Sequence, residues 1–235
     1  MIQIVAVNGS PSAEKGNTAT LLAAFLDGVK EAGASVELFY TKRLAIKPCD
    51  GDLSCRYKAP GECVIQDDMQ ALYPKLREAD ILILATPVYI PLPGKFQIFL
   101  NRLCPLVAPE LVTVEGRTRG RFHEDVKIKK VVLVATGGWW ELGNFDTVVR
   151  IAEELAKDAI VEFTGAILRP HASLMQQVPA KKEEILNAAK TAGMQLIENG
   201  AFSPDLLQTI RQPLIDQEEL RRRYNATYER IARKV

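Results

Sequence analysis

Two patterns of apolar positions follow one another along the chain, and their order predicts strands separated by helices. Short runs of β-branched and other apolar residues predict buried strands. Segments in which apolar residues recur every three or four positions predict amphipathic helices. The strands are expected near residues 2–7, 35–40, 81–85, 130–135 and 160–168. The helices are expected near residues 18–32, 69–76, 95–103, 145–158, 180–198 and 217–234.

This order of elements predicts a fold class. Strands that alternate with helices are joined by crossover connections, which produce an open parallel sheet with helices on both faces. We therefore expect an α/β three-layer sandwich around a five-stranded parallel sheet, formed by residues 1–200. Residues 44–66, which hold three cysteines, and residues 107–126, a solvated excursion, are expected as insertions. Residues 201–235 are expected to form a C-terminal helical extension that serves oligomerisation, giving a homodimer or a homotetramer.

Composition and charge exclude several classes of protein. The chain has 47% hydrophobic and 25% charged residues, which is typical of a globular domain. Its net charge of +1 gives no reason to expect nucleic acid or an anionic membrane surface as a partner. No apolar run approaches the roughly 20 residues of a membrane helix, and no signal-peptide pattern opens the chain. We expect a cytoplasmic protein without a membrane partner.

The loops at one edge of the predicted sheet carry the candidate chemistry. Ligands of open α/β sheets bind beyond the carboxyl ends of the strands, here after Val7, Ala85 and Ala135. The first of these loops, residues 8–18, is rich in hydroxyl and small side chains and leads into a helix N-terminus, which favours an anion. The loop has neither the lysine of a nucleoside triphosphate loop nor the glycine spacing of a dinucleotide fingerprint. It therefore predicts a site for a phosphate monoester.

Two of these loops also carry a family resemblance. The pattern G-S-P followed by G-N-T within residues 9–18, and then Thr86-Pro87-Val88-Tyr89, resembles the NAD(P)H-dependent FMN reductases of flavodoxin-like fold. The similarity extends from residue 1 to about residue 170 and is greatest to the iron–sulfur flavoprotein branch. The resemblance implies a flavodoxin-like sandwich with FMN as cofactor and NAD(P)H as co-substrate.

The resemblance also implies which residues contact FMN, in three sets. It implies that the phosphate is held by Ser10, Ser12, Asn17 and Thr18. It implies that the ring and the ribityl chain are contacted by Pro87, Val88, Tyr89 and Ile90. It implies that the pyrimidine edge of the flavin meets the third loop, Thr136, Gly137, Gly138 and Trp139.

The cysteine-rich insertion adds a candidate metal site. Clustered cysteines in a reducing compartment favour a metal or redox site over a disulfide. In the iron–sulfur flavoproteins this position carries C-x2-C-x2-C-x(4–7)-C for a [4Fe–4S] cluster, and here an aspartate replaces the second cysteine. Three interpretations remain open: a cluster, a zinc ion on the same four side chains, or a loop without metal. The candidate ligands are Cys49, Asp52, Cys55 and Cys63. Cys104, in an apolar helix pattern, is expected to be a small core residue.

The expected function follows from the resemblance. It is an FMN-dependent oxidoreductase that passes electrons between NAD(P)H or a ferredoxin-type carrier and an acceptor such as a quinone, oxygen or a metal ion, with the cluster as a further electron carrier. No catalytic side chain is expected, because hydride transfer to flavin needs positioning and electrostatic tuning. The alternative is a non-enzymatic, flavodoxin-like electron carrier, which the near-neutral charge disfavours. His123 and His171 are expected in surface or capping roles.

Overall fold

A five-stranded parallel sheet forms the centre of the computed structural model, which describes residues 1–232. The strand order is β2-β1-β3-β6-β7, and every pair is parallel. The strands are β1 (Gln3–Asn8), β2 (Ser35–Tyr40), β3 (Ile81–Pro87), β6 (Lys130–Thr136) and β7 (Glu162–Arg169). The order reverses beside β1, because the chain adds β2 on one side and then returns to add β3 on the other. The predicted five-stranded parallel sheet is confirmed.

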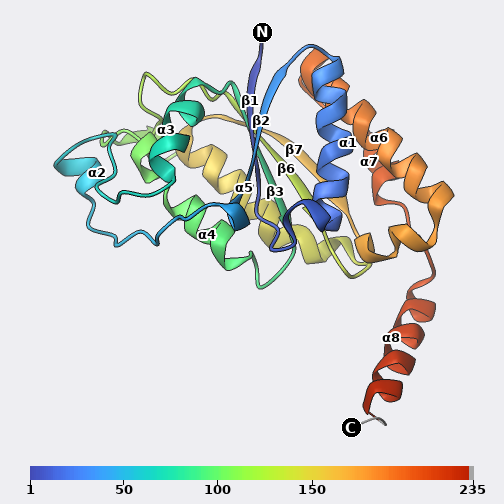
Figure 1. Cartoon of the computed structure of the whole chain (residues 1–235). Coiled ribbons are helices and arrows are strands. Elements are labelled where there is room, and N and C mark those ends of the chain that lie inside the picture. Colours follow the sequence, from blue (N-terminus) through green and yellow to red (C-terminus); the bar gives the residue numbers. More distant parts are fainter. Residues whose placement is uncertain (233–235) are drawn as a thin grey trace.

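Helices cover both faces of this sheet (Figure 1). One layer consists of α1 (Asn17–Glu31), α6 (Pro179–Glu198) and α7 (Pro204–Arg211). The other consists of α3 (Met69–Glu78), α4 (Gly94–Asn101) and α5 (Asp146–Ala159). Successive strand residues point to opposite faces, so alternate residues of β3 enter the two cores, with Ile83 on the α1 side and Leu84 on the α4 side. The predicted three-layer sandwich is confirmed.

Helices α1 and α6 approach each other backbone to backbone. A Cβ atom added to Gly28 would lie 1.8 Å from the carbonyl oxygen of Lys190, and one added to Gly193 would lie 2.0 Å from that of Phe25. Only glycine fits at either position. This contact fixes the place of α1, whose N-terminus follows the first loop.

The two insertions pack beside α3, α4 and α5. Residues 44–66 contain the short helix α2 (Ser54–Tyr57), and the 3-10 helix η3 (Cys104–Leu106) follows α4. Residues 107–126, expected as a solvated excursion, contain an antiparallel hairpin, β4 (Val112–Val114) and β5 (Arg117–Arg119), and all but Val126 are exposed or partly exposed. Its turn consists of Glu115 and Gly116, both with positive φ. Strands of three residues are too short to show an alternating pattern.

The C-terminal region has two helices with different surroundings. Helix α7 packs against α6 and β7, and its Ile210 is fully buried. Helix α8 (Gln217–Ala232) projects away from the sandwich (Figure 1), with Leu220 as its buried residue. The predicted helix end at 234, and the last three residues of the predicted extension 201–235, lie outside the described residues. Within residues 1–232, no helix combines the length and apolarity needed to cross a membrane.

Candidate functional site

The first loop folds back over the N-terminus of α1. The side chain of Asn8, at the buried end of β1, accepts a hydrogen bond from the Ser10 amide at 2.8 Å. The Ser10 hydroxyl accepts one from the Ser12 amide at 3.2 Å. A Cβ atom added to Gly16 would lie 2.9 Å from Ser10 Oγ and 3.0 Å from Ser12 Cβ. Both serines therefore lie against the residue that precedes α1.

Helix α1 begins with unpaired amides. Within residues 1–232, the backbone N–H groups of Asn17, Thr18 and Ala19 donate no hydrogen bond, and no side chain caps the helix at Gly16. The first turn carries no acidic residue. Free amides at the positive end of a helix dipole favour an anion. The geometry at this terminus suits a phosphate group.

Hydrogen bonds join the first loop to the loops after β3 and β6. The hydroxyls of Thr18 and Thr136 lie 2.7 Å apart and are buried. The amide of Val88 donates to the carbonyl oxygen of Thr136 at 2.8 Å. The three loops that the sequence singled out therefore meet at one edge of the sheet, beside the reversal in strand order.

A pocket of about 550 Å³ opens between these loops, which is within the usual range for small-molecule sites. Eight of its lining residues were predicted as flavin contacts: Asn17, Pro87, Val88, Tyr89, Thr136, Gly137, Gly138 and Trp139. Four were not: Asn144, Ala172, Ser173 and Tyr224. These four follow β6 or β7 or lie on α8, in segments that carry no recognisable loop motif.

The other four predicted flavin contacts lie outside this lining. Ser10 and Thr18 are buried beside the α1 terminus, and Ser12 is exposed next to them. Ile90 is fully exposed and does not line the pocket. For all twelve predicted residues, contact with flavin stays a prediction.

Aromatic side chains surround the mouth of the pocket. Tyr89 and Trp139 are each about half-exposed, at 54% and 55%. The ring of Tyr224 on α8 meets the ring of Trp139 edge to face, with centroids 5.3 Å apart. The C-terminal helix therefore reaches the rim of the pocket.

A buried histidine lies behind the third loop. His171 is fully buried, and within the described chain neither of its ring nitrogens has a hydrogen-bond partner. Its ring lies 5.4 Å from that of Trp140, and its backbone has a positive φ. Burial, followed by the charge of Arg169, lowers the pKa of His171. His171 is therefore not a surface residue, but it occupies the N-cap position of the 3-10 helix η5 (Ala172–Gln177), without a side-chain capping bond.

The cysteine insertion brings distant thiols together. All four cysteines are free, and the buried Cys55 thiol donates to Cys104 Sγ at 3.7 Å. Cys104 is half-buried and faces this insertion, which corrects the expectation of a core residue. The exposed Asp52 carboxylate accepts hydrogen bonds from the Ser54 amide and hydroxyl at 3.2 and 3.1 Å. As residues 1–232 are arranged, no group of three or more Cys, His, Asp or Glu side chains could hold a metal ion.

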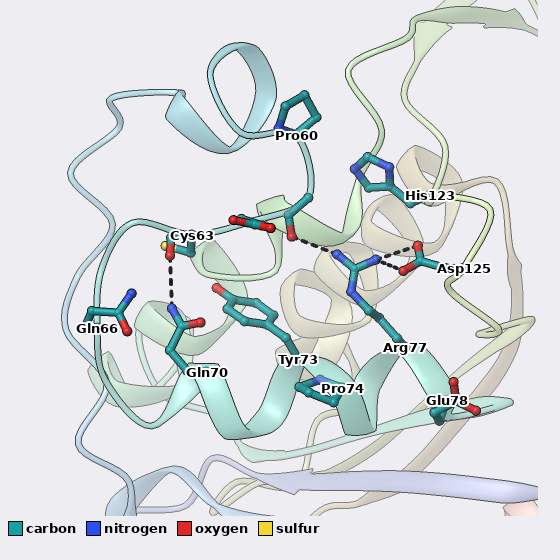
Figure 2. A pocket seen from close by; sticks show the side chains of 12 residues that line it. Pro60, Cys63, Gln66, Gln70, Tyr73, Pro74, Arg77, Glu78, His123 and Asp125 are labelled. Atoms are coloured by element: carbon teal, nitrogen blue, oxygen red, sulfur yellow. Dashed lines mark hydrogen bonds and ion pairs between the residues drawn. The ribbon is translucent and has the colours of Figure 1, made fainter.

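A second hollow, of about 720 Å³, lies beside Cys63 (Figure 2). Arg77 crosses it and donates to the Gly61 carbonyl oxygen at 2.8 Å and to Asp125 at 2.6 Å. His123 lines this hollow, and its Nε2 atom is buried without a partner in the described residues. Burial, followed by the charge of Arg77, lowers the pKa of His123. His123, for which a surface or capping role was expected, is therefore half-buried.

Comparison with known proteins agrees with this geometry. The model of a family described as NADPH-dependent FMN reductase matches residues 2–150, which is more than half of the chain. The match contains the first two loops and the whole cysteine insertion, and it reaches beyond the third loop.

The curated relatives are iron–sulfur flavoproteins. An iron–sulfur flavoprotein of Archaeoglobus fulgidus is 35% identical over 88 residues, which are 37% of this chain and 41% of that protein. One of Methanocaldococcus jannaschii is 32% identical over 106 residues, 45% of this chain and 53% of that protein. The chain spans about half the length of the curated relatives it matches.

Solved structures share the fold at low identity. An NAD(P)H:quinone oxidoreductase from Methanothermobacter marburgensis has a TM-score of 0.57 at 17% identity, covering 83% of this chain and 96% of that one. An FMN-dependent NADH-azoreductase from Bacillus anthracis, in complex with FMN, has a TM-score of 0.58 at 13% identity, covering 86% and 100%. These structures establish the likeness in fold.

Proposed function

This chain belongs to the NADPH-dependent FMN reductase family, and we therefore propose that it is an FMN-dependent oxidoreductase with NAD(P)H as co-substrate. One observation carries the proposal. The three unpaired amides at the start of α1 lie at the edge of a pocket of about 550 Å³, and Asn17 belongs to both. This pairing of an anion site with a walled pocket fits a ligand that carries a phosphate on one end and a ring on the other.

The residues of the site would hold FMN in three ways. The amides of Asn17, Thr18 and Ala19, with the nearby serines, would bind its phosphate. Tyr89 and Trp139 would wall the ring. A side chain on Gly137 would meet Phe145 at 2.8 Å, whereas nothing lies within 4 Å of a Cβ added to Gly138. The third loop therefore presents bare backbone to the pocket.

When bound, FMN would supply a ring that takes hydride from NAD(P)H and passes electrons to an acceptor such as a quinone, oxygen or a metal ion. We also propose that a ferredoxin-type carrier can donate electrons in place of NAD(P)H. An iron–sulfur cluster in the cysteine insertion would be a further electron carrier. We propose that the protein is cytoplasmic, because clustered free cysteines are typical of a reducing compartment. The protein's own part is to bind and orient, because the pocket lining contains no Asp, Glu, His, Lys or Cys.

Replacing Thr18 with Val tests the flavin site. The wild-type chain should bind FMN and oxidise NAD(P)H. Thr18→Val removes the hydroxyl that joins the first and third loops and leaves Thr136 without its buried partner, so the Kd for FMN should rise about tenfold. Flavin fluorescence quenching measures the Kd, and NAD(P)H absorbance measures turnover.

A matched control lies on α6. Thr191→Val removes an exposed hydroxyl whose bond goes to its own helix at Asn187, so it should leave the Kd unchanged. Failure of the wild-type chain to bind FMN would overturn the proposal. Binding of FMN without NAD(P)H oxidation would favour the electron carrier.

We also propose that α8 joins two or more copies of the chain. Its exposed Tyr224, Tyr228 and Ile231 recur at helical spacing and form one apolar face. Through Tyr224 this face is continuous with the aromatic rim of the pocket. A second copy on this face would enclose the flavin site.

Charge on this face tests the assembly. Tyr228→Lys with Ile231→Lys should convert a homodimer or homotetramer to a monomer, because lysines would have to be buried without partners. Analytical ultracentrifugation measures the mass. Leu111→Lys places the same charge on another exposed apolar residue, at 61% exposure, and should leave the mass unchanged. A monomeric wild-type chain contradicts this proposal.

A further inference from the structure

Two cysteines that are 49 positions apart in the chain meet between the cysteine insertion and the segment that follows α4. Cys55 lies on α2 and Cys104 opens η3, and these two short helices pack against each other. The two sulfur atoms lie 3.7 Å apart, and both thiols are free. A structural thiol needs only apolar neighbours, whereas two thiols in contact can also react with each other.

Two arginines form hydrogen bonds between these segments. Arg56 on α2 donates to the carbonyl oxygen of Ala108, beyond η3, at 3.3 Å. Arg77 on α3 donates to the carbonyl oxygens of Gly61, in the insertion, and Pro105, in η3, at 2.8 and 3.4 Å. These bonds keep α2 and η3 side by side, so the contact between the two sulfur atoms is set by the fold.

The two thiols form a pair rather than part of a larger set of metal ligands. In the part of the chain that the structure describes, no group of three or more Cys, His, Asp or Glu side chains could hold a metal ion. Asp52, the candidate ligand nearest to Cys55 in the sequence, instead accepts hydrogen bonds from the amide and the hydroxyl of Ser54. The thiol that contacts Cys55 is therefore that of Cys104.

The two cysteines differ in their access to solvent. Cys55 is buried, at 8% exposure, whereas Cys104 is partly exposed. Burial raises the pKa of the Cys55 thiol to about 12, and its hydrogen bond with Cys104 adds to this effect. Cys104 is therefore the thiol that an oxidant in solution meets first, and Cys55 reacts second.

We propose that Cys55 and Cys104 are a redox-active pair that hydrogen peroxide converts reversibly to a disulfide. The two sulfur atoms must approach by about 1.7 Å, since a disulfide bond is about 2.05 Å long. A change of rotamer at either cysteine moves its sulfur by more than this distance. Disulfides in a reducing compartment are usually transient and often serve redox sensing, which fits a pair that dithiol reductants can restore.

The oxidation has two steps. The Cys104 sulfur attacks one oxygen of the peroxide, the O–O bond breaks, and hydroxide takes up the thiol proton and leaves as water, which gives a sulfenic acid. The Cys55 sulfur then attacks the Cys104 sulfur, the S–S bond forms, and the S–O bond breaks as the hydroxyl group leaves as water with the Cys55 proton. Two thiols and one peroxide therefore give one disulfide and two waters, and the two electrons come from the sulfur atoms.

A disulfide and an iron–sulfur cluster are alternative states of Cys55. A cluster ligand is a thiolate, and a sulfur bonded to Cys104 is not one. The disulfide therefore belongs to the chain without a cluster. The inference does not depend on the proposed flavin function.

Thiol counting and peptide mapping of the full chain test the pair. The reduced wild-type chain should have four reactive thiols when denatured, and two after treatment with one equivalent of hydrogen peroxide. Mass spectrometry without reductant should find the peptide of Cys55 linked to that of Cys104, and dithiothreitol should restore all four thiols. The oxidised chain should also unfold at a higher urea concentration, because the bond closes a long loop in the unfolded chain.

Single serine variants are the controls. Cys55→Ser and Cys104→Ser should form no disulfide under the same treatment. Cys49→Ser should form it as the wild type does, because Cys49 is outside the pair. Far-ultraviolet circular dichroism under reducing conditions should be the same in all three variants and the wild type. If a variant fails to fold, the peptide map of the wild type decides the question alone.

Three results would overturn the proposal. They are a disulfide between Cys55 and another cysteine, no disulfide in the peroxide-treated wild type, and wild-type iron that is lost in Cys55→Ser. The last result would assign the Cys55 thiol to a cluster. A chain that forms the predicted disulfide but binds no FMN would remove the proposed flavin function and leave this inference intact.

Discussion

Arg102→Met should destabilise the protein by about 3–5 kcal/mol, the usual cost of removing one partner of a buried ion pair. Arg102 and Asp67 have side-chain exposures of 1% and 2%, with Nη1 2.6 Å from Oδ2. The variant leaves the Asp67 charge buried and partly unpaired. It also frees the carbonyl oxygens of Lys47 and Ile65, so the cysteine insertion loses two hydrogen bonds to the end of α4. Urea unfolding, monitored by circular dichroism, measures the difference.

An exposed ion pair is the control. Arg43 and Glu14 pair at 3.1 Å with side-chain exposures of 67% and 47%. Arg43→Met should cost less than about 1 kcal/mol, because solvent screens such pairs. Equal losses in the two variants would contradict the assignment of Arg102 as the anchor of the insertion.

The loss in Arg102→Met should also depend on pH. Burial acts to raise the pKa of Asp67, but hydrogen bonds from Arg102 and from the amides of Lys47 and Met69 outweigh it, so the pKa is lowered. A carboxyl with a lowered pKa stabilises the fold above its unfolded pKa, and that contribution is lost as the pH falls through the folded pKa. The difference in unfolding free energy between the wild type and the variant should therefore be largest near neutral pH. It should become smaller in acid, below about pH 4.

The fold could be predicted from the sequence because the patterns that indicate its strands and helices lie within short segments. Residues 81–85 and 131–135 are apolar throughout, which is what a central strand with two covered faces requires. The loop before α1 was recognisable for the same reason, since its small and hydroxyl residues lie within eleven positions. Where ligands bind in such a sheet follows from its topology.

The missed features depend on contacts between distant residues. Cys104 is spaced like a core residue of a helix, and only the 3.7 Å contact between its sulfur and Cys55 Sγ shows that it faces the cysteine insertion. Tyr224 reaches the pocket because α8 leaves the sandwich next to the third loop. His171 is buried beside Trp140, which belongs to the loop after β6. No pattern within a short window contains this information.

Gly193→Ala should destabilise the protein by about 3 kcal/mol, at the upper end of the usual cost of overpacking. The added methyl carbon would lie 2.0 Å from the carbonyl oxygen of Phe25 and 3.0 Å from the amide of Val29, both backbone atoms of α1. Neither can turn aside as a side chain could, so α1 and α6 must separate. Because α1 carries the amides of the first loop, the Kd for FMN should rise with the loss of stability.

Gly94→Ala supplies the control for this substitution. Gly94 opens α4, and a Cβ added there meets nothing within 4 Å. The change should be neutral or stabilise the fold by about 0.4–1 kcal/mol, since alanine restricts the unfolded chain. Thermal unfolding of both variants, with FMN titration of each, checks the pair. A Gly193→Ala protein with wild-type stability and wild-type FMN binding would mean that the two helices are further apart than described. A Gly193→Ala protein with wild-type stability but weaker FMN binding would show that the helix pair serves mainly to place the first loop.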